Sequence, residues 1–488
     1  MSSKRASSVI FLLAFTALLV AIHLPYLKLP FFWDEMGQFV PAALDLYHDG
    51  AWVPHSAIPN VHPPGLMAIL AVVWRLFGFS IASARLTMLL IASAGVLFSF
   101  LLAIRLARGT AGAPALAAVL FLMAAPIFYT QSMMVLLDMP AMTFTVLALL
   151  LFLDGRYRAC AIACTALVLI KETAISTPFV FAAWLWFREK RRREALYFAG
   201  PALAVGAWLM VLKHATGHLF GNPDFARYNI DESLTLVHIA AALGRRLYFL
   251  FVGDGHFIGA FAIFAGWRVL KGKDWTIAAL VAAAQLLVVT VFGGATLDRY
   301  VMPVLPTVYA AMAAAACVYP SSWRWTSHSV MIGLFVLGWF WNPPYPFPYE
   351  NNLAMTDFVA LQREAASYLE AYAPDQHIAS AWPFSEAVRH PEFGYVSRPL
   401  QTEQIPGFHP ADLANLDRNK VDVLVVFSRT WSVEGRALDI RLFRDFLRNY
   451  YDYHPQASSE EIRAGLGYVL VKRWTRGGQF IEIYLPER

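Results

Sequence analysis

The sequence predicts a polytopic α-helical membrane protein with a small α/β domain at its C-terminal end. Of its 488 residues, 58% are hydrophobic and only 15% are charged, whereas soluble domains carry about 25% charged residues. Apolar segments of membrane-spanning character recur from residue 9 to residue 341, separated by polar loops. From residue 351 onward the composition is that of an ordinary soluble domain.

The basic residues indicate membrane topology rather than nucleic-acid binding. The isoelectric point is about 9.0, but the basic residues are scattered over short loops, with no long basic patch interleaved with aromatic residues. Loops rich in Lys and Arg are typical of the cytoplasmic side, and the run at 188–193 is the strongest example. The three cysteines lie in or beside apolar segments and predict neither disulfides nor a metal site.

Residues 9–29 are predicted to form the first span, entering from the cytoplasm. Lys4 and Arg5 precede it as in a signal peptide, but no small-x-small cleavage site follows, so we expect the span to be retained. Residues 34–48 place apolar side chains on one helical face, which predicts a helix lying in the membrane interface. Pro63 and Pro64 suit the first turn of a second interfacial helix.

The remaining spans follow from hydropathy and the positive-inside rule, which together predict about eleven. They are 84–104, 114–129, 139–153, 159–170, 173–187, 196–212, 247–270, 275–292, 301–318 and 330–341. An external loop at 214–245 is expected to carry a helix around 234–243. The predicted domains are a transmembrane core at 1–342, a Pro-rich linker at 343–350 and an extracytoplasmic domain at 351–488.

The C-terminal domain alternates helical and strand-like patterns. Helices are predicted at 356–372 and 436–450, and strands at 377–381, 421–427, 468–474 and 480–485. This alternation predicts a small α/β domain.

On this topology, polar residues from distant parts of the chain gather near the outer membrane face. They are Asp34, Glu35, His55, His62, Asp138, Lys171, Glu172, Asp298 and Arg299. Ionisable residues at membrane depth are costly and usually functional. A cup of carboxylates and cations at a membrane surface suits a substrate with a lipid tail and a charged head.

The order of these motifs resembles that of the GT-C glycosyltransferases, most closely the group of protein O-mannosyltransferases and lipid A aminoarabinose transferases. The resemblance covers residues 9–340 and is carried by Asp34-Glu35, His62-Pro63-Pro64, Leu137-Asp138-Met139-Pro140 and Asp298-Arg299-Tyr300 with the later Pro303 and Pro306. Aminoarabinose transferases tend to have Lys-Pro-Pro at the second motif. The mannosyltransferases continue with Leu-Gly-Lys, where this chain has Gly65-Leu66-Met67. The acceptor therefore stays open between lipid, glycan and protein.

The resemblance implies a polyprenyl-phosphate sugar donor and a single inverting displacement outside the cytoplasm. The acceptor hydroxyl must lose a proton as it attacks, and Asp34 is the expected base; capping of a surface helix is the alternative role. Glu35 could orient Asp34, hold the acceptor or help to bind a divalent cation. Asp138 is expected beside the donor sugar or acceptor, and its alternative role is an N-cap.

The leaving lipid phosphate needs cations to stabilise its developing charge. Arg299 is the best candidate because a guanidinium matches phosphate in bidentate fashion; snorkelling to the interface is the alternative. Lys171 could bind the phosphate or pair with Glu172. Tyr300 could donate a hydrogen bond to the phosphate, and His62 could contact the phosphate or a metal, or be structural.

Other cofactors and functions have weaker support. His55, His62, His214, His218 and His256 could face outward, but their spacing predicts no resident metal site, and a divalent cation stays a possibility. No glycine-rich phosphate loop follows a strand, which disfavours a nucleotide-sugar donor. A lipid or sugar transporter or flippase is an alternative, although no inverted repeat is seen; a non-catalytic membrane scaffold is another.

The compact loops and the resemblance suggest a bacterial inner membrane. The active site and the C-terminal domain would then face the periplasm. The expected partners are the lipid-linked donor, its acceptor and membrane lipids.

Overall fold

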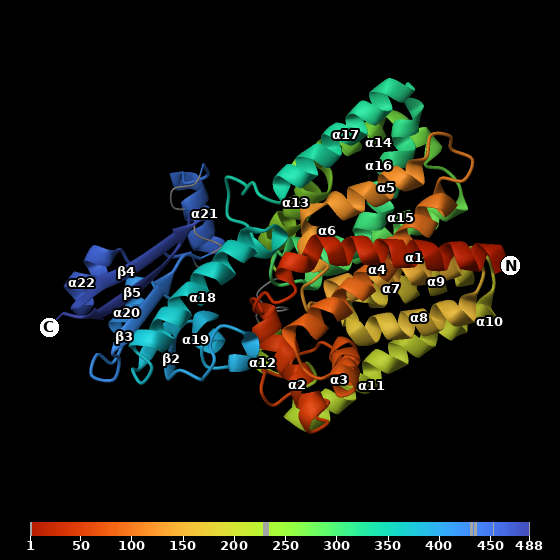
Figure 1. The fold of residues 1–488 in the computed structure, drawn as a ribbon. Coiled ribbons are helices and arrows are strands. Elements are labelled where there is room, and N and C mark those ends of the chain that lie inside the picture. The colour runs from red at the N-terminus through yellow and green to blue at the C-terminus, as the bar shows by residue number, and fades with distance from the viewer. Residues whose placement is uncertain (1, 228–233, 430–432, 434–436, 452, 488) are drawn as a thin grey trace. The chain divides into compact units, whose positions relative to one another are not determined.

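A computed structural model describes residues 2–227, 234–429, 433, 437–451 and 453–487 (Figure 1). The chain divides into two compact units. The helical unit consists of Met1–Leu24, Phe39–Phe79 and Ser83–Trp339. The sheet unit consists of Pro25–Gln38, Ser80–Ala82 and Phe340–Arg488. The segment after the first helix thus groups with the C-terminal part of the chain. The predicted domains differ on this point, because they assign that segment to the transmembrane core at 1–342.

The helical unit is built from closely packed, mostly apolar helices. They are α1 (Ser2–His23), α2 (Val40–His48), α3 (Gly65–Phe77), α4 (Ile81–Leu106), α5 (Pro114–Ala124), α6 (Pro126–Gln131), α7 (Asp138–Leu153), α8 (Tyr157–Ile170), α9 (Ser176–Ala183), α10 (Arg192–Ala195), α11 (Ala199–Thr216), α12 (Pro223–Ala226), α13 (Leu236–Phe251), α14 (His256–Gly266), α15 (Lys273–Phe292), α16 (Leu305–Ala315) and α17 (Ser321–Gly338). Within this bundle α8 packs against α7 and α11, and α16 packs against α5 and α14.

Among the described residues, six helical segments are long and apolar enough to cross a membrane. They are Ser7–Tyr26, Ile81–Leu106, Arg192–Thr216, Leu236–Val269, Lys273–Phe292 and Asp298–Val318. Shorter apolar helices accompany them at Gly65–Phe77, Pro114–Ala124, Asp138–Leu153 and Tyr157–Ile170. The chain is therefore an integral membrane protein, and the expected total of about eleven spans stays a prediction.

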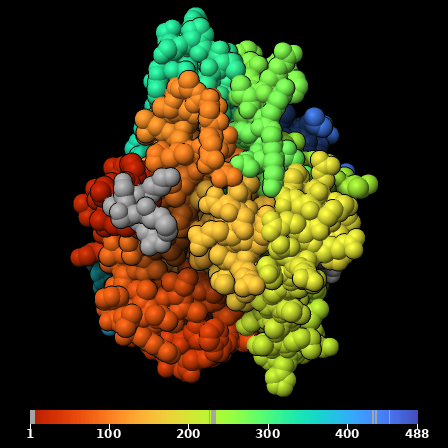
Figure 2. Space-filling model, turned by 90° about the vertical axis from the view of Figure 1, so that its right-hand side faces the viewer, coloured from red at the N-terminus to blue at the C-terminus, as the bar shows by residue number. Residues whose placement is uncertain are grey.

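Several basic loops that were predicted to be cytoplasmic meet at one end of the helical unit. Arg105, at the end of α4, pairs with Asp274 at 2.7 Å and with Asp154 at 3.2 Å. Lys273 pairs with Glu189. Figure 2 faces the end of the unit at which α1 begins and shows the orange, yellow and green segments side by side there. These loops therefore share one side of the bundle, as the predicted span directions require.

The structure corrects the continuity of three predicted helices. Pro126 divides the predicted span 114–129 into α5 and α6, because proline cannot donate the backbone hydrogen bond that would continue the helix. The helix expected around 234–243 is the beginning of α13 and runs on to Phe251. The span predicted at 247–270 is interrupted at Gly253–Gly255, where Asp254 has φ +52°.

The predicted interfacial helices are also refined. The first begins with an irregular π-helical turn, η2 (Glu35–Phe39), before α2. The second, α3, begins with Pro64 as its N-cap residue, at the place that the proline pair predicted.

The sheet unit contains a mixed five-stranded sheet with strand order β2-β1-β3-β5-β4. Its strands are β1 (Ile378–Ala381), β2 (Thr402–Ile405), β3 (Val423–Phe427), β4 (Tyr468–Arg476) and β5 (Gln479–Pro486). The β2-β1-β3 pairs are parallel, and the β3-β5 and β5-β4 pairs are antiparallel. Four strands were predicted; β2 was missed because it is a short edge strand, and its Glu403 and Gln404 are exposed.

Helices complete the sheet unit (Figure 1). They are α18 (Ala354–Tyr372), α19 (Phe384–Ala387), α20 (Pro410–Ala414), α21 (Arg441–Tyr451) and α22 (Ser459–Leu466). α18 packs along β4 and β5, and its buried side chains include Phe358, Leu361 and Leu369. The two predicted helices correspond to α18 and α21, and the α/β character of this part of the chain is confirmed.

Candidate functional site

The carboxylates of Asp34 and Glu35 lie in a tight turn of the sheet unit. Trp33 begins the turn in the left-handed region with φ +52°, a conformation that is uncommon for a bulky residue. The backbone N–H of Phe32 donates to the fully buried Glu35 carboxylate at 2.8 Å. Glu35 thus fixes the backbone of the turn, while Asp34 keeps partial exposure to solvent.

Residues from the C-terminal part of the chain hold this turn. The ring of Trp33 meets Trp382 edge-to-face at a centroid distance of 4.5 Å, and it lies 6.1 Å from the ring of Phe358 on α18. The hydroxyl of Tyr395 donates to the carbonyl of Phe31 at 2.8 Å. The conformation around Asp34 therefore depends on residues more than 300 positions later in the chain.

A buried ionic cluster in the helical unit brings together Asp138, Lys171 and Arg299. Asp138 is the first residue of α7, Lys171 directly follows α8, and Arg299 lies in η9 (Asp298–Val304). Lys171 donates to Oδ1 of Asp138, and Arg299 Nε lies 3.1 Å from Oδ2. All three residues are at most 6% exposed. We call this group the Asp138 cluster.

This geometry decides between earlier alternatives. The residue before α7 is Leu137, and no side chain caps the helix, so the N-cap role considered for Asp138 is wrong. Lys171 pairs with Asp138, and Glu172 instead pairs with His62 at 2.9 Å, so the local pairing of Lys171 with Glu172 is wrong as well. Arg299 is buried in the protein rather than snorkelling to the interface.

The Asp138 cluster concentrates buried charged side chains at one place in the helical unit. Two cations share the single carboxylate of Asp138. The neighbouring acid Asp298 is already engaged by Arg245, through contacts of 3.2 and 3.1 Å to its two oxygens. The ring of Tyr300 lies under Lys171, with Nζ 4.3 Å from the ring centre, which adds a cation–π contact. The cluster therefore places two buried cationic side chains beside an aromatic ring.

Sequence reasoning missed Arg245 and Arg246. Arg246 is 1% exposed, and Gly293 lies beside it: a Cβ added at Gly293 would meet Arg246 at 3.1 Å and Tyr300 at 3.2 Å. Arg246 therefore borders the same region as Tyr300. The available signal was a pair of arginines inside the apolar helical pattern of α13, but the predicted span began only at residue 247.

The first loop of the helical unit is organised by acidic residues. The carboxylate of Asp45 accepts hydrogen bonds from the backbone N–H groups of His55 and Ser56, each at 2.8 Å. His55 also bonds Asp49 at 2.7 Å, which raises the pKa of His55 and lowers that of Asp49. His55 thus has a structural role in closing this loop.

Across the described part of the chain, no group of three or more His, Cys, Asp or Glu side chains is placed to hold a metal ion. His62 pairs with Glu172, and His256 is buried, with Nε2 2.9 Å from the hydroxyl of Tyr309. Asp34 and Glu35 belong to the sheet unit, and the Asp138 cluster with His62 and Tyr300 belongs to the helical unit. Their convergence on one substrate stays a prediction, as do their individual roles.

No family model and no curated protein matches this sequence. Solved structures do match it over nearly its whole length. ArnT from Cupriavidus metallidurans bound to undecaprenyl phosphate aligns with a TM-score of 0.55 at 15% identity, covering 97% of each chain. The apo state of the same protein aligns with a TM-score of 0.53 at 15% identity, covering 96% of this chain and 98% of that one.

A looser match is the archaeal oligosaccharyltransferase AglB from Archaeoglobus fulgidus in complex with an inhibitory peptide and a dolichol-phosphate. Its TM-score is 0.45 at 11% identity, over 98% of this chain and 74% of that one. The matches to ArnT extend through both units. This chain therefore has the fold of ArnT, a GT-C glycosyltransferase, and the resemblance that its motifs predicted is confirmed at the level of the fold.

Proposed function

We propose that this protein is a membrane glycosyltransferase that moves a sugar from a polyprenyl-phosphate carrier to an acceptor hydroxyl on the extracytoplasmic face. The observation that carries this proposal is the Asp138 cluster, in which two buried cations share one carboxylate. Burial of a charge is costly unless it is compensated. Lysine and arginine side chains bind phosphate oxygens, so the two cations of the cluster suit the phosphate of a lipid-linked sugar.

The fold supports the same class of donor. ArnT has been solved with undecaprenyl phosphate bound, so a protein of this architecture accommodates a polyprenyl phosphate. The helical unit of this chain provides what such a ligand needs, because apolar helices surround a buried cationic site. A transporter or flippase would need one binding site that opens to each side of the membrane in turn, and the contacts of the described residues supply no argument for such a function.

The proposed reaction is a single displacement at the anomeric carbon. The acceptor oxygen forms a bond to that carbon while the bond from the carbon to the phosphate oxygen breaks, which inverts the configuration. The hydroxyl proton passes to the carboxylate of Asp34, and the polyprenyl phosphate leaves with the bonding electron pair. Lys171 and Arg299 stabilise the developing phosphate charge, and Tyr300 adds its hydroxyl as a donor.

The remaining residues act by positioning these groups. Asp138 orients the two cations through one oxygen each. Glu35 holds the turn that presents Asp34. His62 pairs with Glu172, the residue next to Lys171 in the chain, and this pair supports the proposal that His62 lines the donor site.

The experiment is a binding measurement followed by a transfer measurement. Purified full-length protein is titrated with a panel of polyprenyl-phosphate sugars, and ligand-induced thermal stabilisation is recorded for wild type, Arg299→Ala and Arg299→Lys. Arg75→Ala is the matched control, since Arg75 lies in the same unit on α3 and donates to the carbonyl of Leu46, outside the cluster. We expect stabilisation of wild type and Arg75→Ala, a reduced effect in Arg299→Lys and none in Arg299→Ala.

The transfer measurement then uses the stabilising donor with candidate lipid, glycan and peptide acceptors. Equal donor stabilisation of wild type and Arg299→Ala would contradict the phosphate role of the cluster. No stabilisation by any polyprenyl-phosphate sugar would contradict the donor class itself. A reporter fused after Arg488 tests the orientation, and we expect it to be active outside the cytoplasm.

A further inference from the structure

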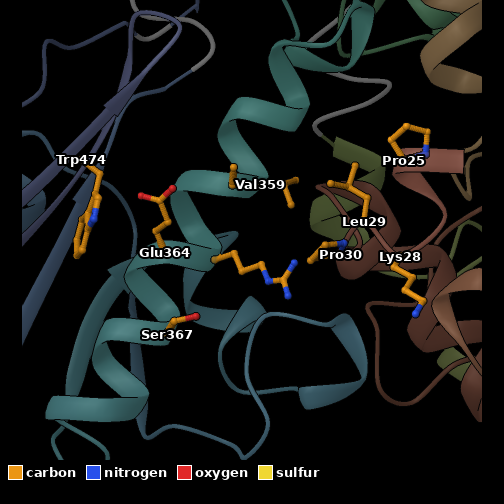
Figure 3. Close-up of a pocket in the computed structure, with 10 residues that line it drawn as sticks. Pro25, Lys28, Leu29, Pro30, Val359, Glu364, Ser367 and Trp474 are labelled. Atoms are coloured by element: carbon orange, nitrogen blue, oxygen red, sulfur yellow. The ribbon is translucent and has the colours of Figure 1, made fainter. Parts of the chain in front are cut away.

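The sheet unit contains a cavity that is separate from the residues proposed for catalysis. Its volume is about 530 Å³, and it lies between the segment that follows α1 and the exposed face of α18. Figure 3 shows Lys28, Leu29 and Pro30 on one side of α18, Glu364 and Ser367 on the helix, and Trp474 of β4 on the other side. This volume is in the range of cavities that hold small organic ligands.

The charged side chains of this cavity leave a positive balance. Lys28 and Arg363 both line it, and neither forms an ion pair with any residue that the structure describes. The acid of the lining is Glu364, and its carboxylate lies 3.6 Å from Arg476, which does not line the cavity. The lining therefore holds two cations, Lys28 and Arg363, against the one carboxylate of Glu364, which Arg476 also contacts.

The rest of the lining is apolar or aromatic. Pro25, Leu29 and Val359 provide aliphatic surface. Trp474 is held in place by an edge-to-face contact with Tyr368 of α18, at a centroid distance of 5.7 Å. A ligand that fits this lining is therefore amphipathic, with an anionic group and an apolar part.

The chain connects the cavity directly to the membrane. The first candidate span, Ser7–Tyr26, contains Pro25, which is itself a lining residue. Lys28 and Leu29 follow this span at once, at the level where a helix leaves the hydrocarbon for the headgroup region. The ligands present at the highest local concentration there are membrane lipids, whose phosphates carry the negative charge that the cavity lacks.

We propose that this cavity binds the phosphate headgroup of an anionic membrane lipid. Lys28 and Arg363 bind the phosphate, because both side chains form charge-assisted hydrogen bonds with phosphate oxygens. Leu29, Pro25 and Val359 contact the glycerol and the first acyl carbons, and Trp474 closes the far side. The bound lipid tethers α18 to the end of the first span. The inference goes beyond the proposed glycosyl transfer and does not depend on it.

The test uses the full-length protein in detergent, with native mass spectrometry to count bound lipid and a titration to measure affinity. The probes are phosphatidylglycerol, phosphatidylcholine and the water-soluble phosphate ester sn-glycerol 3-phosphate. The variants are Lys28→Ala/Arg363→Ala and the charge-conserving exchange Lys28→Arg/Arg363→Lys. The matched control is Arg398→Ala/Lys420→Ala, which removes one arginine and one lysine that are exposed on the same unit and do not line the cavity.

We expect wild type to bind phosphatidylglycerol in preference to phosphatidylcholine. The double alanine variant should bind it about tenfold more weakly, since hydrogen bonds to charged groups are lost. The charge-conserving exchange and the control should bind as wild type does. All four residues are exposed, so each variant should fold, and its thermal unfolding in the absence of lipid verifies this.

Three results would overturn the inference. Equal phosphatidylglycerol affinity of wild type and the double alanine variant would remove the cavity as the site. An equal loss in the control would show general attraction between a basic surface and anionic lipid. Binding of sn-glycerol 3-phosphate as tight as that of the lipid would assign the cavity to a soluble phosphate ester instead. None of these results would affect donor binding at Arg299, so the two proposals fail independently.

Discussion

Removing the carboxylate of Asp138 should strongly destabilise the helical unit, because Asp138 is buried and ion-paired. Asp138→Asn keeps the size and shape of the side chain but takes away the single negative charge that Lys171 and Arg299 share. Lys171 is then buried without the carboxylate to which it donates. Because Asp138 is 2% exposed, water cannot replace the lost charge without opening the packing around it.

The expected magnitude follows from this burial. Breaking a buried ion pair by removing one partner costs about 3–5 kcal/mol, because an uncompensated charge is left in the interior. For a large domain this corresponds to a fall in melting temperature of roughly 5–10 °C. The matched control is Asp154→Asn. Asp154 also pairs with an arginine, Arg105, at 3.2 Å, but its side chain is 53% exposed, so the loss should be about 1 kcal/mol or less.

The assay is thermal unfolding of each purified variant in the same detergent, followed by a double-mutant cycle. Asp138→Asn/Lys171→Met restores the net charge of the wild-type cluster, since it removes one anion and one cation. This variant should therefore recover part of the lost stability. Two results would refute the explanation that Asp138 neutralises buried positive charge. One is an equal melting temperature for Asp138→Asn and Asp154→Asn, and the other is a double variant no more stable than Asp138→Asn.

Three further predictions concern the sheet unit and the turn that it holds. Asp34→Asn should abolish sugar transfer while the protein stays folded and binds donor, and an active, folded variant would remove Asp34 as the base. Tyr395→Phe loses the 2.8 Å hydrogen bond to the Phe31 carbonyl and should cost about 1 kcal/mol in thermal unfolding, with a fall in transfer rate that Arg398→Ala does not share.

The hydrogen bond that protonated His390 donates to the Glu386 carboxylate, together with the charge of Glu392, raises the pKa of His390 above 6.5, and the same bond lowers the pKa of Glu386. The stabilisation from protonated His390 is therefore complete below pH 6.5 and is lost as the pH rises through its raised pKa; the contribution of Glu386 is lost in acid. The check is to measure melting temperature against pH. In His390→Gln the fall in melting temperature above pH 6.5 should be smaller than in wild type, and an unchanged fall would contradict the role of His390.

Much of the architecture could be predicted because it is set by local patterns. The mean hydropathy of +0.50 and the long apolar segments indicate a membrane bundle whatever its packing. Pro64 directly precedes α3, and the strand-like patterns at 468–474 and 480–485 correspond to β4 and β5, since both signals depend on neighbouring residues. The edge strand β2 was not predicted, because its sequence does not alternate between apolar and polar residues.

The candidate site likewise has a part that the sequence predicted and a part that only the tertiary structure decided. The order of Asp34, Asp138, Lys171 and Arg299 along the spans identified the residues and the membrane face on which they were expected. Only the tertiary structure decided that Lys171 pairs with Asp138 rather than with adjacent Glu172, because helix packing brings α7, α8 and η9 together. It also decided that Arg246 borders Tyr300 and that Trp382 and Tyr395 hold the turn at Asp34. Pairings across hundreds of residues depend on the packing of the folded chain, which a linear pattern does not contain.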